Sequence, residues 1–240
     1  MHNPPPEAPD DLGESPRHGF QGDRGREAPA RIVPAGLTIA LSREAGARGG
    51  SIARRAGRKL GWPVYDQELL EYMAQEASAR QGVVENLTGP AAAWVEARLQ
   101  ELSYLEDPGR QPFLTHLARV VLALGAQGGV VLIGRGAGCI LPADSTLNVR
   151  VVAPLGERIA YMSQWLRLTE EEAAERVRLR DQRRAEFIET HFRRLPDEVH
   201  QYDLVLNSSL LGEELCADLI AEAARARAAQ FGGRAADEAG

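Results

Sequence analysis

The sequence predicts an α/β fold with a mainly parallel sheet of five strands. Short apolar segments alternate along the chain with longer segments of helical period, which is typical of consecutive βαβ units. Two of the apolar segments, 130–133 and 149–152, are continuous runs of the kind found in strands buried on both faces. A hydrophobic content of 44% over 240 residues is enough for one globular domain of this class.

The strands are predicted at 37–41, 64–65, 130–133, 149–152 and 204–206. Helical patterns fill 52–60, 67–79, 91–105, 114–124, 155–166 and 170–191, and a terminal helix is expected to begin near Glu213. Gly61 follows the first of these helices and suits a left-handed cap at its end. The connections between parallel strands are expected to be right-handed crossovers.

Both ends of the chain are expected to lie outside the domain, which is expected to span 36–224. Residues 1–35 are rich in proline and charge and bury too little apolar area to offset the entropy of ordering, so a disordered tail is expected. Residues 225–240 are rich in Ala, Arg and Gly and are expected to form a flexible tail. Inside the domain, the side chains expected to pack in or near the core include Trp94, His116 and Trp165.

The composition argues against several classes of function. A net charge of −6 argues against a nucleic-acid partner. The longest apolar runs, 120–124 and 130–133, are far shorter than the roughly 20 residues of a membrane span, so no membrane partner is expected. Cys139 and Cys216 are far apart and have no CxxC partner, which argues against a disulfide framework or a cysteine-based metal site. Together with the polar N-terminus, these features favour a cytoplasmic protein.

A glycine-rich segment at 42–51, SREAGARGGS, lies between the first predicted strand and the first predicted helix. Glycines let backbone N–H groups turn toward an anion, and a helix N-terminus adds positive potential, so this segment is a candidate phosphate loop. Compared with G-x-x-x-x-G-K-[ST], Gly49 and Ser51 fit, but Glu44 replaces the first glycine and Gly50 replaces the lysine. The candidate replacement cations are Arg43, Arg48 and Arg54. The alternative is a strand–helix turn that merely contains three glycines.

Five motifs in order give a resemblance that covers about 37–221. They are IALSREAGARGGSIA at 39–53, LGWPVYD at 60–66, VLIGRG at 131–136, DQRRA at 181–185 and YDLVLN at 202–207. Together they resemble the cytidylate kinase-like family, a branch of the P-loop nucleoside monophosphate kinases. The resemblance implies a three-layer P-loop NTPase fold, with a helical acceptor-binding region at 67–124 and a lid-like region at 167–200.

The implied activity is ATP-dependent phosphoryl transfer to a nucleoside monophosphate, CMP-like, or to a similar small phosphate acceptor. Nucleotides would be the partners, and ATP and Mg²⁺ the cofactors. By resemblance, the donor would be held by Arg43, Gly46, Ala47, Arg48, Gly49, Gly50, Ser51 and Ile52. Ser51 would also contact Mg²⁺, directly or through water. Asp66 would support the magnesium shell or the acceptor, although it is equally suited to cap the helix that begins near Gln67.

Arg135 is the implied acceptor-binding residue after the third strand. Its glycine neighbours allow a close backbone approach, and its planar guanidinium suits bidentate contact with phosphate. The alternative is a surface arginine in a βα loop. Related kinases carry an aspartate directly after this arginine, where the present chain has Gly136. In the helical region before it, the candidates for recognising a base are Glu71, Gln75, Arg80, Asn86 and Arg98.

The implied catalytic residues lie in the arginine-rich region 158–194: Arg158, Arg180, Asp181 and Arg184. A closing lid would bring these arginines to the transferring phosphate and exclude water. The alternative is a solvated helix face on which acidic and basic residues pair at i,i+4 spacing. His191 is a possible base, but a phosphate acceptor needs no strong base, and a histidine near a helix C-terminus suits the dipole. Asp203 and Asn207 either line an adenine pocket or cap local structure.

The departures at Gly50 and Gly136 leave a second class of function open. Without the loop lysine, the chain is also consistent with a degenerate, non-catalytic nucleotide-binding regulatory protein. A third interpretation is a phosphate or sulfate binder that uses the same loop. The sequence sets neither the acceptor nor the oligomeric state.

Overall fold

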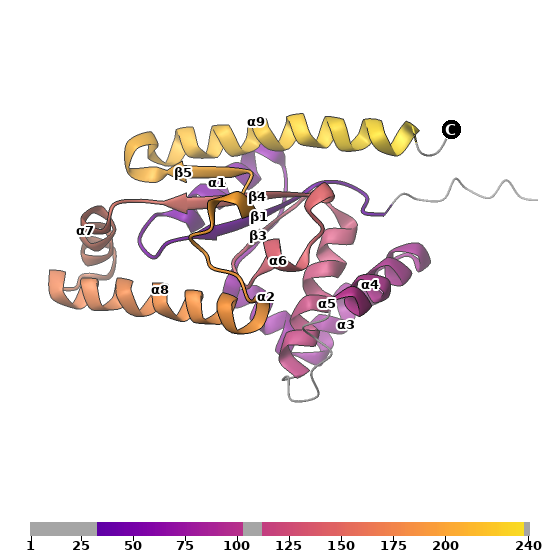
Figure 1. Ribbon diagram of the computed structural model, residues 1–240, viewed down its shortest axis with the longest axis horizontal. Coiled ribbons are helices and arrows are strands. Elements are labelled where there is room, and N and C mark those ends of the chain that lie inside the picture. Colours follow the sequence, from indigo (N-terminus) through magenta and orange to yellow (C-terminus); the bar gives the residue numbers. More distant parts are fainter. Residues whose placement is uncertain (1–32, 103–111, 238–240) are drawn as a thin grey trace, which may run out of the picture. The chain divides into compact units, whose positions relative to one another are not determined.

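The five predicted strands form one parallel sheet (Figure 1). The computed structural model describes residues 33–102 and 112–237, so most of the tail predicted at 1–35 and the end of the helix predicted at 91–105 lie outside the described residues. The strands are β1 (Thr38–Arg43), β2 (Val64–Tyr65), β3 (Val130–Ile133), β4 (Thr146–Val152) and β5 (Leu204–Asn207). Their order is β2-β3-β1-β4-β5, and every neighbouring pair is parallel.

The predicted helices are present among the described residues, most of them with shifted bounds, but a short helix at 137–140 and most of the helix at 77–85 were not predicted. They are α1 (Gly49–Leu60), α2 (Gln67–Gln75), α3 (Ala77–Glu85), α4 (Gly89–Glu101), α5 (Pro112–Gln127), α6 (Ala137–Ile140), α7 (Leu155–Leu166), α8 (Glu170–Phe192) and α9 (Ser208–Asp237). Two short 3₁₀ turns lie at Ala143–Ser145 and Val199–Gln201. The predicted left-handed cap after α1 is confirmed, because Gly61 has a φ of 71°. The helix predicted at 67–79 is interrupted at Glu76, whose backbone is extended.

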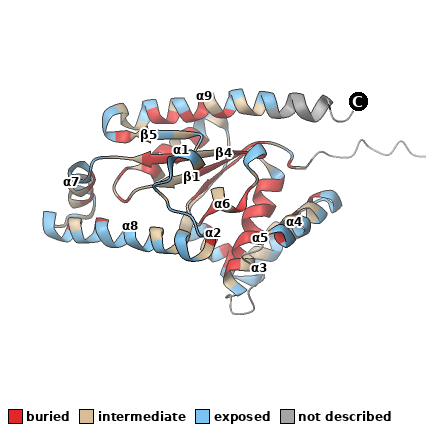
Figure 2. Ribbon diagram, in the orientation of Figure 1, coloured by how far each residue is buried: buried red, intermediate tan, exposed pale blue. Residues whose placement is uncertain are grey.

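Helices cover both faces of the sheet and make three layers. Side chains alternate along β1, so Ile39 and Leu41 pack against α1 and α9 while Ala40 packs against the α5 and α6 side. Figure 2 shows the buried residues concentrated in the strands and in α5. This alternation also turns Ser42 toward the α6 side, at the end of the strand where ligands bind in open α/β sheets.

The helices α7 and α8 are attached beside the end of β1 by a small apolar cluster. Met162 of α7 and Ala173 and Val177 of α8 pack with Ala45, which follows β1. The start of α8 is fixed by a capping box, in which Thr169 and Glu172 bond reciprocally. The prediction that Trp165 packs in the core was wrong: 68% of it is exposed, because it stacks on Tyr161 along the outer side of α7.

The last helix is interrupted near its start. Asn207 Oδ1 accepts hydrogen bonds from the N–H groups of Ser209 and Leu210, and Gly212 then breaks the helix with a φ of 73° and a ψ of 168°. The predicted start near Glu213 therefore matches the part of α9 beyond Gly212. Helical backbone continues to Asp237, and the flexibility expected of 225–240 stays a prediction. Within the described ranges, no helix is both long and apolar enough to span a bilayer.

Candidate phosphate-binding site

The glycine-rich loop runs from the end of β1 to the first turn of α1. Arg48 closes the loop in the left-handed region, with a φ of 59°, and caps α1 without a side-chain hydrogen bond. The structure gives no acceptor, within its described part, for the N–H groups of Gly46, Arg48, Gly49 and Gly50. Open N–H groups at a helix N-terminus are the donors that a phosphate needs. The loop therefore offers open backbone donors suited to an anion.

A network of charged side chains holds the loop from the side of α7 and α8. Arg158 is 8% exposed, and its Nη1 donates to Asp181 Oδ2 at 2.5 Å and to the carbonyl of Ala45 at 3.1 Å. Asp181 Oδ1 accepts from the N–H of Ala45 at 2.7 Å, and Glu44 lies 3.4 Å from Arg158 Nε. The structure thus brings Arg158 and Asp181 together with the loop, as structural supports of its backbone.

The other predicted loop residues divide between the loop and the core. The side chains of Ala47 and Ile52 are fully buried, and the N–H of Ile52 bonds to the carbonyl of Arg48. The side chain of Arg48 lies over the ring of Tyr161, with its guanidinium carbon 4.8 Å from the centroid. Gly50 faces open space except for the guanidinium of Arg54, which lies 3.7 Å from the position of an added Cβ.

Ser51, the predicted magnesium contact, donates its hydroxyl hydrogen bond to Glu213 Oε2 at 2.5 Å. The Ser51 hydroxyl and the Glu213 carboxylate therefore place two oxygen atoms side by side at the start of α1, and Mg²⁺ prefers oxygen ligands of this kind. In the part of the chain that the structure describes, no group of three or more His, Cys, Asp or Glu residues is placed to hold a metal ion.

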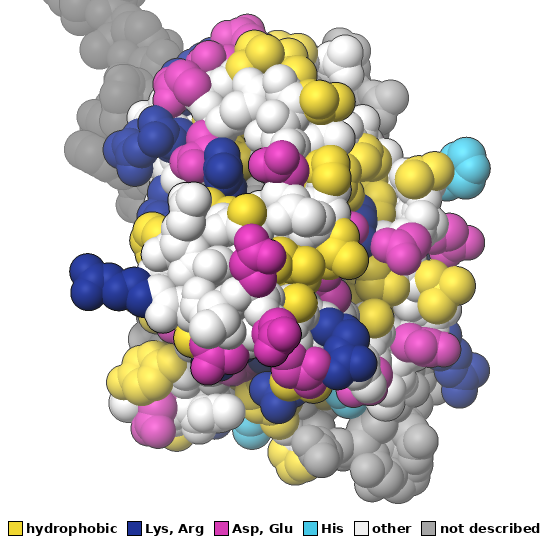
Figure 3. All heavy atoms as spheres, turned by 90° about the vertical axis from the view of Figure 1, so that its left-hand side faces the viewer, with side chains coloured by type: hydrophobic (Ala, Val, Ile, Leu, Met, Phe, Trp, Pro, Cys, Tyr) yellow, Lys and Arg dark blue, Asp and Glu magenta, His cyan; other side chains and the backbone are white. Residues whose placement is uncertain are grey.

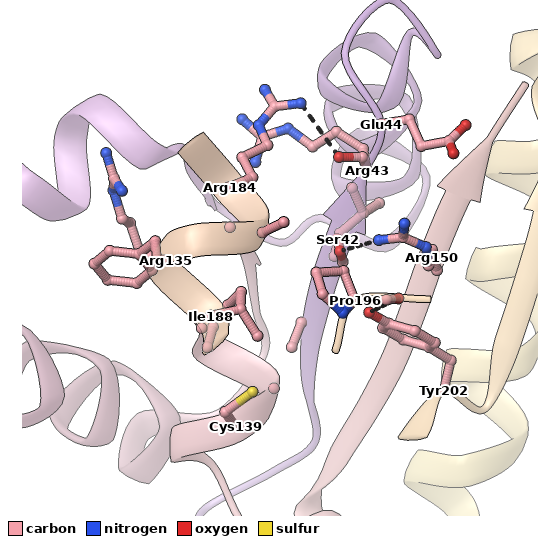
Figure 4. A pocket seen from close by; sticks show the side chains of 18 of the residues that line it. Ser42, Arg43, Glu44, Arg135, Cys139, Arg150, Arg184, Ile188, Pro196 and Tyr202 are labelled. Carbon is pink, nitrogen blue, oxygen red and sulfur yellow. Dashed lines mark hydrogen bonds between the residues drawn. The ribbon is translucent and has the colours of Figure 1, made fainter. Parts of the chain in front are cut away.

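A pocket of about 440 Å³ lies next to the loop, between the ends of β1, β3 and β4 and the helices α6 and α8 (Figure 4). This volume is typical of small-molecule sites. Its charged lining residues are Arg43, Glu44, Arg135, Arg150, Arg158, Asp181, Arg184 and Asp197. Arginines thus outnumber carboxylates five to three in the lining. On the face that carries α7, by contrast, acidic and basic side chains are intermixed (Figure 3).

Arg43 is the arginine that joins the loop to the pocket. An added Cβ at Gly49 would lie 2.6 Å from Arg43 Cβ, and one at Gly134 would lie 2.5 Å from its Nη1, so both glycines leave room for this side chain. Among the described residues, no carboxylate or carbonyl bonds to its guanidinium. Burial, and then the nearby charge of Arg184, lower the pKa of Arg43 to about 9. Arg184 also donates to the carbonyl of Arg43 (Figure 4).

Arg135 enters the pocket from the other side, in a left-handed conformation with a φ of 51°. Such a conformation is uncommon for a residue other than glycine and often marks a functional site. Arg135 forms an ion pair with Glu71 of α2 and lies over the ring of Phe187, 4.8 Å from its centroid. Its Nε is buried without a partner among the described atoms, and burial lowers its pKa.

Gly136 has no room for the aspartate of related kinases. Its φ is 68°, and an added Cβ would overlap the ring of Phe192. The end of α8 therefore occupies the space in which a carboxylate at this position would begin.

Arg150 of β4 also lines the pocket and was missed by the sequence reasoning. It is 7% exposed, and it donates to Ser42 Oγ at 3.2 Å and to Asp197 Oδ1 at 2.7 Å. The available signal was the period of two in β4, where Asn148 and Arg150 interrupt an otherwise apolar strand.

The remaining predicted residues lie outside the pocket lining. Asp66 caps α2 by accepting the N–H of Leu69 at 3.1 Å, although its charge still acts on Arg43. Arg180 is exposed on α8. Asp203 accepts from the N–H of Asn148 and from Arg227, which fits the structural alternative for this residue. His191 packs against Phe187 with the rings 4.7 Å apart.

The sheet order, the glycine loop at the end of β1 and the helices α7 and α8 beside it define a P-loop-type fold of the nucleotide-kinase class. The chain belongs to the cytidylate kinase-like family, whose model matches residues 38–210. Family membership supports a nucleotide kinase-like role and leaves the substrate open.

One solved structure supports this fold, and a second is similar at a lower level. An uncharacterised protein from Eubacterium ventriosum is 16% identical and superposes with a TM-score of 0.65, covering 79% of this chain and 98% of that one. A shikimate kinase from Bacteroides thetaiotaomicron is 14% identical with a TM-score of 0.42, covering 78% of this chain and 94% of that one. Its lower score carries no argument about activity.

One curated protein also matches in sequence. A uronate isomerase from Corynebacterium glutamicum is 33% identical over 104 residues, which is 43% of this chain and 20% of that protein. The present chain therefore spans about a fifth of the length of this relative.

Proposed function

We propose that this protein transfers the γ-phosphoryl group of ATP to a nucleoside monophosphate, CMP-like, or to a similar small phosphate acceptor. Family membership supports a nucleotide kinase-like role. The observation that carries the proposal is the position of Arg43, whose stem runs past Gly49 of the loop and whose guanidinium reaches the pocket at Gly134. A cation between a donor loop and an acceptor pocket is where phosphoryl transfer needs one.

The donor phosphates would bind at the open N–H groups of Gly46, Arg48, Gly49 and Gly50. Magnesium would be held beside Ser51 and Glu213, and when bound it would neutralise charge on the phosphates. The acceptor phosphate would enter the pocket and bind Arg184 and Arg135. The protein then acts mainly by positioning two phosphates and neutralising charge between them.

Arg43 would supply the charge that the loop lysine supplies in other P-loop proteins. Gly50 carries no side chain, whereas the Arg43 guanidinium lacks a carboxylate partner among the described residues. Desolvation makes this charge costly in the free protein, and a phosphate in contact with it would remove that cost. Arg43 thus favours an anion held between the two sites.

The test is a coupled ADP-release assay with ATP and Mg²⁺ across nucleoside monophosphates and other small phosphates. Turnover with at least one acceptor is expected, and Arg43→Met is expected to lower kcat by about 10²- to 10³-fold, as for the loss of one transition-state donor. Arg58→Met is the matched control, since this exposed arginine lies at the far end of α1. Absence of turnover with every acceptor would contradict the proposal. A loss confined to Arg54→Met would assign the charge to Arg54 instead.

A specific observation supports a second function, that of a nucleotide-binding regulatory protein without catalysis. Protein carboxylates already bind two groups of the loop, Asp181 the N–H of Ala45 and Glu213 the hydroxyl of Ser51. In this alternative, ATP binds the loop but is not transferred. In this alternative, calorimetry would show tight ATP binding while the coupled assay shows no ADP release. Turnover with any acceptor would exclude the regulatory function.

A further inference from the structure

Arg150 lies next to Tyr202 and Ser42, on the opposite side of the pocket from Arg135 (Figure 4). Its side chain is 9% exposed, so most of its hydration is lost. The ring of Tyr202 lies 5.6 Å from the guanidinium carbon, and Ser42 offers one neutral oxygen at 3.2 Å. These partners compensate only part of the cost of burying a charge.

Asp197 is the carboxylate bound to Arg150, and the two side chains differ sharply in exposure. Arg150 Nη2 lies 2.7 Å from Asp197 Oδ1, but 92% of the Asp197 side chain is exposed. Solvent weakens the attraction of an exposed carboxylate, so this pair stabilises the fold little. A ligand oxyanion reaching Arg150 from inside the pocket would be less solvated than Asp197 and would therefore interact more strongly.

We propose that Arg150 binds an oxyanion of the ligand and that this oxyanion replaces Asp197. The inference rests on the proposed function and narrows its acceptor. A phosphate held by Arg184 and Arg135, together with a second oxyanion at Arg150, describes a small acceptor with two such groups. This acceptor differs from a nucleoside monophosphate, whose phosphate is its only anionic group.

The test measures the affinity of inorganic phosphate by thermal shift, without ATP. Asp197→Asn is expected to raise the affinity about fivefold, because a competing carboxylate of a weak ion pair is removed. Arg150→Met is expected to lower it. In the Arg150→Met background, Asp197→Asn is expected to have no effect, since Asp197 acts only through Arg150.

Glu198→Gln is the matched control. It removes the same charge from the neighbouring position, and Glu198 is exposed and outside the pocket lining. Equal affinities for Asp197→Asn and Glu198→Gln would overturn the proposal. Both changes lie on an exposed segment, so this comparison is independent of how well the Arg150 variants fold.

Two further arms define the ligand. The same titrations with acetate distinguish the sources: a gain with phosphate alone assigns a phosphoryl group to Arg150, and a larger gain with acetate than with phosphate assigns a carboxylate. If there are two subsites, phosphate should still raise the melting temperature of the Arg150→Met variant. Adding Arg184→Met to that variant should abolish this remaining rise. A single subsite, lost completely in Arg150→Met, would overturn the acceptor with two oxyanions. Because binding is measured without ATP, a failure of phosphoryl transfer would not affect these results.

Discussion

The charged groups that support the glycine-rich loop and the Arg43 side chain in the neighbouring pocket differ in how their charges are matched. In the loop, charged groups are matched within the protein: Arg158 pairs with Asp181 and Glu44, and Ser51 bonds to Glu213. In the pocket, Arg43 has no carboxylate partner among the described residues, and burial lowers its pKa to about 9. The loop is therefore built as a supported scaffold of backbone donors, while the positive charge available to a ligand lies at the end of β1.

Under the proposed function, this difference lets the site do without the usual loop lysine. The cation does not have to come from α1, because Arg43 at the end of β1 passes Gly49 and reaches the same region. Removing an arginine that supports the loop should consequently lower stability, whereas removing Arg43 should weaken anion binding.

The largest expected effect is on the stability of the loop. Arg158→Met should lower the free energy of unfolding by about 3 kcal/mol, because it leaves Asp181 and Glu44 without their buried partner. Urea denaturation followed by circular dichroism measures it. Arg178→Met is the control, since it removes an exposed i,i+3 pair with Glu175 on α8 and should cost less than about 0.5 kcal/mol. Equal losses would show that the network does not support the loop.

The next effect concerns the pocket glycine after Arg135. Gly136→Asp should destabilise the fold by about 2–3 kcal/mol, because the new Cβ overlaps Phe192 and the backbone is left-handed. Gly156→Asp in the first turn of α7 is the control, because nothing lies near its added Cβ and a carboxylate suits a helix start. Thermal unfolding gives the melting temperatures of the two variants, and that of Gly136→Asp should be the lower. Similar melting temperatures would contradict the expected clash.

Replacing Arg43 is expected to have a smaller effect on stability, and this effect is a gain instead of a loss. Without a bound anion, Arg43→Met should raise the free energy of unfolding at pH 7 by about 1–2 kcal/mol, because a desolvated charge is removed. The folded pKa of about 9 lies below the ordinary value of 12.5, so between these values the unfolded chain binds more protons. Stability of the wild-type protein should therefore rise through pH 9, and the advantage of the variant should shrink. Urea unfolding at pH 7 and pH 10 tests both statements, and a variant less stable than wild type at pH 7 would refute them.

The smallest effect is expected when the lysine is restored to the loop. Gly50→Lys should change kcat by less than about threefold, because Arg43 already supplies the charge and the guanidinium of Arg54 repels a new cation. The ADP-release assay measures it. A rise of tenfold or more would show that the loop lacks its cation and would reverse the comparison between loop and pocket.

The fold could be predicted largely because its signals are local. The continuous apolar run 130–133 became β3 with the same bounds, and Gly61 caps α1 as its position indicated. Helix boundaries were less predictable, since the break at Glu76 has no glycine or proline to mark it. Trp165 was misplaced because an aromatic residue on a helix gives no indication of which side meets the core.

The site was predictable only where the motifs lie. The loop residues and Arg135 occur in short segments that the chain order brings to one sheet edge. The hydrogen-bond partners of these residues depend on tertiary contacts. Glu213 is 162 positions from Ser51, and the sequence around either residue gives no sign that the two are bonded. Arg150 was not predicted for a different reason, because a single charged residue in a mainly apolar strand belongs to no motif.

The shared carboxylate of Asp181 has a consequence for motion. It holds the loop at Ala45 and α7 at Arg158 at the same time, while Arg184, one turn further along α8, holds the carbonyl of Arg43. Moving α8 away would break these bonds together, since each depends on the same rigid helix. Opening of this region should therefore be cooperative, with one barrier and two defined positions of the helix, instead of a gradual loosening.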